Sequence, residues 1–129
     1  MDKKTGIVRI LFAFKHSGKG FQWLLKNEAA FQQELVLAVL LVPLSFLINE
    51  TLSELLLLLM TLALVLIVEI LNTEIETVVD RIGLEHHELS GPAKDLGSAA
   101  VLLSLLLAAG VWVTFLWRYW LTLTGASSH

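Results

Sequence analysis

The chain has 129 residues, of which 56% are hydrophobic and 16% charged, with a formal net charge of −3. Apolar runs this long cannot be buried against one another in so short a chain, so an ordinary water-soluble globular domain is excluded. The sequence contains no cysteine, which excludes disulfides and thiolate metal sites. The expected class is an all-α membrane protein that forms a single domain over residues 1–129.

Residues 1–26 are expected to form an amphipathic helix in the membrane interface, with a short soluble helix as the alternative. Aliphatic and aromatic side chains are interspersed here with six cations, which are Lys3, Lys4, Arg9, Lys15, Lys19 and Lys26. This mixture is typical of helices that anionic headgroups attract. Gly18 and Gly20 are expected to break or bend the helix. The segment lacks the cleavage site of a secretory signal peptide, so we expect it to be retained.

Three membrane-crossing helices are predicted, at about residues 28–48, 52–80 and 96–120. The first contains Pro43, which neighbouring helices can accommodate. The third begins with the small residues of "GSAA", which allow close helix packing. It ends in four aromatic residues that are expected to form an interfacial belt, namely Trp112, Trp117, Tyr119 and Trp120.

Residues 81–95 are predicted to form a polar loop that faces the cytoplasm. The expected helix breakers in this segment are Gly83, Gly91 and Pro92. Lysine and arginine are concentrated in the N-terminal segment and in this loop, whereas residues 49–54 contain neither, so both basic segments are placed on the cytoplasmic side. Arg118 is the exception, and it is expected to extend to the far interface.

A stripe of polar residues on the second crossing is the main candidate site. At about 100° per residue, one helix face carries Glu69, Asn72, Thr73, Glu76 and Asp80. Glu74 points elsewhere. A rise of about 1.5 Å per residue places Glu69 roughly two turns deeper in the bilayer than Glu76. An ionisable group at that depth is costly and indicates function. For Asp80, an ordinary surface ion pair with Arg81 or Lys94 is the expected role.

The stripe has the side chains that phosphoryl transfer needs. Glu69 is placed to accept a proton from a lipid hydroxyl, whereas Glu76, with Glu28, can provide oxygen ligands to magnesium. Lys94 can bind phosphates. The stretch "HSGKG" is too short for a phosphate-binding P-loop. His86 and His87, beside Glu85, are expected to be solvated, and no zinc site is expected.

Three stretches, "NEAAFQQE", "IVEILNTEIETVVDRIG" and "HELSGPAKDLGSAAVLL", closely resemble the prokaryotic diacylglycerol kinase family. The resemblance extends from Arg9 to about Trp117. It implies an ATP- and Mg²⁺-dependent kinase that phosphorylates diacylglycerol to phosphatidic acid at the cytoplasmic face of the bacterial inner membrane. It also implies a homotrimer whose protomers each have a surface helix and three transmembrane helices, with active sites shared between neighbours.

The resemblance also implies roles for individual residues. Glu69 is the expected catalytic base, Glu28 and Glu76 the magnesium ligands. Catalytic geometry is assigned to Asn72, Lys94 and Asp95. The remaining nucleotide contacts are assigned to Arg9, His16, Glu85, His86 and His87. The lipid is expected to be bordered by Arg9, Ala30, Phe31, Glu34, Ser98, Trp112 and Trp117.

Some positions depart from the family pattern. His16 and His86 stand where tyrosine is usual, Pro92 replaces a commonly basic residue, and Glu74 replaces a small one. The alternative functions are an undecaprenol kinase of the same family, a small proton-coupled transporter that uses Glu69, and a scaffold trimer packed through "GSAA". No inverted repeat supports the transporter. No nucleic-acid partner is expected.

Overall fold

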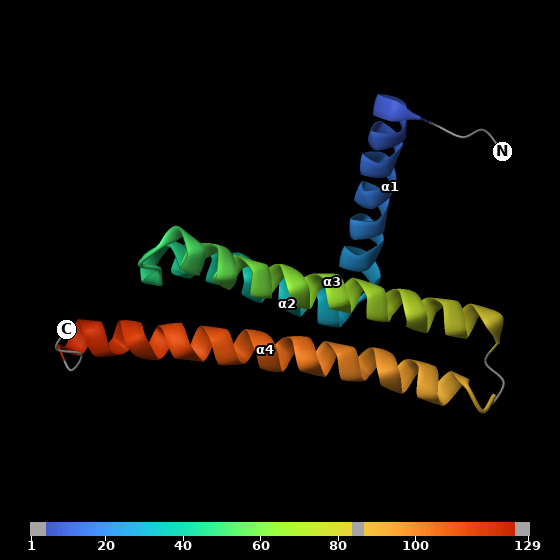
Figure 1. Cartoon of the computed structure of the whole chain (residues 1–129). Helices are drawn as coiled ribbons and strands as arrows, with labels where there is room; N and C mark the ends of the chain where they lie inside the picture. The colour runs from blue at the N-terminus through green and yellow to red at the C-terminus, as the bar shows by residue number, and fades with distance from the viewer. Residues whose placement is uncertain (1–4, 84–86, 126–129) are drawn as a thin grey trace. The chain divides into compact units, whose positions relative to one another are not determined.

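The computed structural model describes residues 5–83 and 87–125. It has four helices: α1 (Gly6–Asn27), α2 (Ala29–Ile48), α3 (Leu52–Ile82) and α4 (Ser90–Thr124) (Figure 1). Strands are absent from the part of the chain that the structure describes. The all-α fold expected from the composition is therefore confirmed.

Three of these helices are long and apolar enough to cross a membrane. They are α2 with 20 residues, α3 with 31 and α4 with 35. At about 1.5 Å per residue, the shortest is about 30 Å long, which matches the hydrocarbon core of a bilayer. Pro43 lies inside α2 without interrupting it. The prediction of three crossings preceded by a separate N-terminal helix is confirmed.

The chain divides into two compact units, Met1–Gln33 and Glu34–His129. In the first unit, α1 continues through Gly18 and Gly20, so the predicted break there is wrong. A helical glycine costs only about 1 kcal/mol relative to alanine, which the flanking turns can offset. Glu28 separates α1 from α2 with an extended backbone, at φ −119° and ψ 105°. Its N–H donates to the Leu24 carbonyl, and its own carbonyl accepts from the Gln32 N–H.

In the second unit, α3 and α4 run antiparallel and side by side (Figure 1). The core cluster consists of Ile48, Leu58 and Trp112. Trp112 is only 5% exposed, and its indole N–H donates to the Thr61 hydroxyl at 3.0 Å. The assignment of Trp112 to an interfacial belt is therefore wrong, because Thr61 satisfies the indole inside the helix packing. Trp117 remains 61% exposed.

Helix α4 begins at Ser90, within the segment predicted as the loop 81–95, and α3 continues to Ile82. The sequence predicts that Pro92 breaks the helix, but this residue lies in the first turn of α4. There, backbone N–H groups have no intrahelical acceptor, so proline costs little. Lys94 and Asp95 are consequently fixed on a helix.

The other end of this unit is joined by what we term the Arg118 clasp, formed by Arg118, Glu54, Glu50 and the Ile48 carbonyl. The guanidinium donates to both Glu54 carboxylate oxygens, at 2.9 and 2.7 Å, and to the Ile48 carbonyl at 3.1 Å. Glu50 lies 3.6 Å from Arg118 Nε. Arg118 therefore connects the ends of three helices, because it forms a bidentate ion pair with α3 and a hydrogen bond with the last residue of α2. The sequence predicts only that the Arg118 side chain extends to the far interface.

Candidate active site

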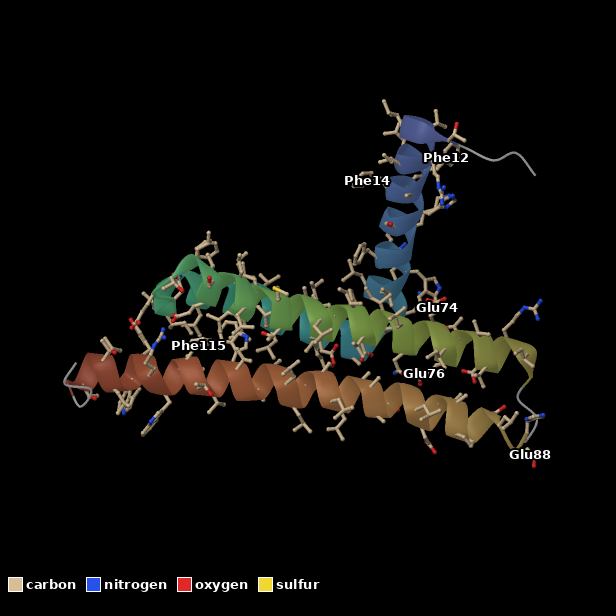
Figure 2. All side chains as sticks on the ribbon, in the orientation of Figure 1. Phe12, Phe14, Glu74, Glu76, Glu88 and Phe115 are labelled. Carbon is tan, nitrogen blue, oxygen red and sulfur yellow. The ribbon has the colours of Figure 1, made fainter. Side chains whose placement is uncertain are left out.

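The polar stripe on α3 is largely buried in the structure. Relative exposure is 5% for Glu69, 8% for Asn72 and 4% for Thr73. Figure 2 shows Glu76 on the side of α3 that faces α4 and Glu74 on the opposite side. Glu74 is exposed. The helical periodicity thus separates a buried polar face from an exposed one, as expected for an amphipathic segment.

The amide of Asn72 is held between two neighbours. Its Nδ2 donates to Glu76 Oε1 at 3.1 Å. On α4, Gly97 lies so close that a methyl group there would collide with Asn72 Oδ1 and approach Asn72 Cγ to 3.3 Å. A larger residue at position 97 would displace the Asn72 amide, so Gly97 helps to keep this amide and, through it, Glu76 in their observed orientation.

A second carboxylate, Glu34 on α2, interacts electrostatically with Glu69. Glu34 also lines a cavity of about 210 Å³ between α2, α3 and α4, and it is the one charged residue in that lining. The other walls are apolar and include Leu37, Val65 and Trp112. Charged side chains in membrane-crossing helices are costly, so Glu34 in this apolar cavity and the buried Glu69 are candidates for a functional site.

The predicted residues on α4 are more accessible. Lys94 Nζ lies 2.6 Å from Asp80 Oδ1, with side-chain exposures of 40% and 51%. Asp80 thus forms the surface ion pair expected of it. Asp95 and Ser98 are exposed. His87 lies just before α4, and its Nδ1 accepts from the Leu89 N–H at 3.1 Å. Glu85 and His86 lie outside the described residues.

Five predicted residues belong to the N-terminal unit. Arg9 and His16 are exposed on α1, and Glu28 is half-buried between the helices. Ala30 is exposed, whereas Phe31 is fully buried. The Phe31 ring lies 6.3 Å from the Phe21 ring. Arg9 and His16 lie on α1, whereas Ala30 and Phe31 lie at the start of α2, so the Glu28 junction sets the spacing between these two pairs.

The site offers few protein ligands to a metal ion. Among the described residues, no group of three or more His, Cys, Asp or Glu side chains is placed to hold a metal. Magnesium does not require such a group, because it commonly uses one or two carboxylates together with substrate phosphates and water. The half-buried Glu76, oriented by Asn72, fits this requirement.

Two features of the site were not evident from the sequence. The stripe included Thr73 but gave no role to its hydroxyl, and "GSAA" indicated close packing without identifying Gly97 as the contact with Asn72. The periodicity was the available signal for Thr73. For Gly97, no local signal identifies the partner, because the contact depends on the register of two helices.

The fold and this site define an α-helical integral membrane protein in which a buried carboxylate, Glu69, and a half-buried one, Glu76, lie on the same helix face as an oriented amide. The family model described as prokaryotic diacylglycerol kinase matches residues 15–116. A curated relative named diacylglycerol kinase from Escherichia coli K12 is 47% identical over 118 residues, which cover 92% of this chain and 97% of the relative. That from Haemophilus influenzae is 46% identical over 112 residues, covering 87% and 95%. That from Pseudomonas aeruginosa is 44% identical over 113 residues, covering 88% and 92%.

The chain belongs to the prokaryotic diacylglycerol kinase family. It is therefore an enzyme of the lipid-kinase class. Membership of this class implies a nucleotide as the phosphoryl donor and a lipid as the acceptor.

Proposed function

We propose that this enzyme phosphorylates diacylglycerol to phosphatidic acid, with ATP as donor and Mg²⁺ as the metal, at the cytoplasmic face of the bacterial inner membrane. The observation that supports this most directly is the buried Glu69 carboxylate, on the same face of α3 as Asn72 and Glu76. A base at membrane depth and a metal ligand nearer the helix end are what a kinase for a lipid alcohol needs.

Glu69 is the proposed general base. The lipid hydroxyl oxygen attacks the γ-phosphorus of ATP, and Glu69 accepts the hydroxyl proton. The bond between the γ-phosphorus and the β,γ-bridging oxygen breaks, which releases ADP. Because phosphoryl transfer depends mainly on positioning and charge stabilisation, the burial of Glu69 matters as much as its basicity.

Glu76 and Glu28 are the proposed magnesium ligands, and Asn72 keeps the Glu76 carboxylate oriented. When bound, magnesium neutralises charge on the nucleotide phosphates. Lys94 and Asp95 are proposed to complete the catalytic geometry. The exposed ion pair between Lys94 and Asp80 can open at little cost, which leaves Lys94 available to phosphate. The remaining nucleotide contacts are proposed to be Arg9, His16, Glu85, His86 and His87.

The lipid is proposed to lie against Glu69, with its border formed by Arg9, Ala30, Phe31, Glu34, Ser98, Trp112 and Trp117. Glu34 connects this border to the apolar cavity between the helices. We further propose a homotrimer in which neighbouring protomers share active sites. The family match favours the kinase over a transporter or a scaffold. The relatives reported above carry the name diacylglycerol kinase, which ranks that lipid ahead of undecaprenol.

The proposal is tested with purified protein in mixed micelles that contain ATP, Mg²⁺ and either diacylglycerol, undecaprenol or ceramide. Phosphate is expected on diacylglycerol. Replacing Glu69 with glutamine is expected to lower kcat by about 10²- to 10⁴-fold, because the base is lost. Size-exclusion chromatography and circular dichroism are expected to be unchanged.

Glu74→Gln is the matched control, because Glu74 is an exposed carboxylate on the opposite side of the same helix (Figure 2). It is expected to retain wild-type activity. Full turnover by Glu69→Gln, or equal losses in both variants, contradicts the assignment of Glu69 as the base. Transfer of phosphate to undecaprenol but not to diacylglycerol contradicts the proposed substrate.

A further inference from the structure

The hydroxyl of Thr73 is buried beside the candidate base without a hydrogen-bond partner. Thr73 is 4% exposed. Its Oγ1 is inaccessible to solvent and has no partner among the described residues. A buried hydroxyl that makes no hydrogen bond loses its interaction with water without compensation. Such a group in a native structure requires an explanation, and a ligand that supplies the missing hydrogen bond is one.

Other hydroxyls on these helices show the usual way of meeting this need. Thr77 donates to the Thr73 carbonyl at 2.7 Å. On α4, Ser104 and Thr114 likewise donate to carbonyls of their own helix, each at 2.7 Å. This local bond is the common arrangement for threonine and serine in helices. The Thr73 hydroxyl does not make this bond, so its hydrogen-bonding capacity is unused among the described residues.

The position of Thr73 along α3 indicates which ligand. It follows Glu69 by four residues and precedes Glu76 by three, which correspond to rises of about 6 Å and about 4.5 Å. All three share the stripe, because four residues rotate the helix by only about 40° past a full turn. In the proposed reaction, Glu69 faces the attacking hydroxyl and Glu76 a metal on the nucleotide. The transferred phosphoryl group passes between these two levels.

We infer that the Thr73 hydroxyl donates a hydrogen bond to a non-bridging oxygen of the transferred phosphoryl group. The inference rests on the proposed kinase reaction. Thr73 keeps its proton and forms no covalent bond. It stabilises the negative charge that the three equatorial oxygens carry as the phosphoryl group moves from ADP to the lipid. Because this charge is greatest in the transition state, the bond acts on turnover rather than on substrate binding.

The first test is to replace Thr73 with valine, which keeps the β-branched shape and removes the hydroxyl. With diacylglycerol and ATP, kcat is expected to fall about tenfold, as for the loss of one hydrogen bond to a charged group, while both KM values stay within about twofold. Thr73→Ser restores the donor and is expected to keep at least about half of wild-type kcat. Thr77→Val is the matched control, because Thr77 is exposed and bonded within its own helix.

A second measurement replaces ATP with ATPγS, whose γ-sulfur accepts hydrogen bonds poorly. The ratio of the ATP rate to the ATPγS rate is expected to be several-fold smaller in Thr73→Val than in wild type. The reason is that the valine variant lacks the hydroxyl group, so it has no hydrogen bond to the γ-phosphate that the sulfur could weaken. This ratio compares two phosphoryl donors, ATP and ATPγS, on the same preparation. The fraction of folded protein affects both rates equally, so the ratio is decisive even if only part of the Thr73→Val protein is folded.

The outcomes separate this inference from the proposed function. If wild type and Thr77→Val transfer no phosphate to diacylglycerol, the proposed function fails. If they do, and Thr73→Val has wild-type kcat or an unchanged ATP to ATPγS ratio, the inference fails. It also fails if Thr73→Val destabilises the oligomer while kcat per folded molecule is unchanged, because a neighbouring copy then satisfies the hydroxyl.

Discussion

Asn72 illustrates how one side chain depends on a glycine in another helix. Its amide donates to Glu76, and Gly97 leaves room for its Oδ1. We predict that Gly97→Ala lowers kcat by about fivefold to tenfold, because the added methyl group forces the amide to rotate and removes its hydrogen bond to Glu76. Steady-state kinetics with diacylglycerol measures the loss.

Gly110 offers the control for this substitution within the same helix. A methyl group at Gly110 meets no atom within 4 Å. Gly110→Ala is therefore expected to leave kcat unchanged and to raise stability slightly, because alanine restricts the unfolded chain and favours a helix. Equal activity losses in the two variants indicate a general effect on α4 and contradict the specific contact with Asn72.

The Arg118 clasp provides a prediction about how the helices are held together. Arg118 and Glu54 come from α4 and α3, and their bidentate ion pair is partly buried, with side-chain exposures of 30% and 22%. We expect Arg118→Gln and Glu54→Gln each to lower the melting temperature by several degrees, because Arg118→Gln leaves Glu54 without its cation and Glu54→Gln leaves Arg118 only the more distant Glu50. The double variant is expected to lose less than the sum of the two single losses.

Thermal unfolding in detergent micelles measures this coupling. Arg81→Gln provides a control, since Arg81 is an exposed arginine at the other end of α3. It is expected to change the melting temperature little. If the two clasp losses add fully, Arg118 and Glu54 act independently, and the clasp does not hold α3 to α4.

At the level of elements, hydropathy predicted the helices well but not their packing. A crossing helix must contain about 20 apolar residues, and this requirement appears directly in the sequence. The start of α4 was misplaced because Pro92 is tolerated in a first helical turn. The burial of Trp112 depends on Thr61, which is distant in the chain. The Arg118 clasp likewise joins residues 64 positions apart, which no local pattern indicates.

For the candidate site, the sequence likewise predicted the local arrangement of residues along one helix but not the contacts between helices. Period 3.6 places Glu69, Asn72 and Glu76 on one face whatever the surroundings. The hydrogen bond from Asn72 to Glu76 is local and follows from their four-residue spacing. The free hydroxyl of Thr73 was not predictable, because it depends on the side-chain rotamer and on the residues packed around it.

The whole molecule is predicted to work as an assembly with composite sites. Within one chain, Glu28 belongs to the N-terminal unit, whereas Glu69 and Glu76 belong to the other. We expect that mixing inactive Glu28→Gln and Glu69→Gln protomers, followed by dissociation and reassembly, restores part of the activity. A mixed oligomer can then form a site with both acids intact.

The control mixes Glu69→Gln with Glu69→Ala, which leaves every site without a base and is expected to stay inactive. Kinase assays across several mixing ratios measure the recovery. If activity is absent at every ratio while native electrophoresis shows mixed oligomers, each site is built from one chain.

Helix α3 has a further consequence for the fate of the product. Its 31 residues extend about 46 Å, whereas a bilayer's hydrocarbon core is about 30 Å thick. This single helix is therefore long enough to extend from the hydrocarbon core of a bilayer into the aqueous phase. Phosphorylation converts a neutral alcohol into an anion, which the depth of Glu69 disfavours. On the proposed assignment of Glu69 as the base, we therefore expect the phosphorylated headgroup to move toward the aqueous end of α3.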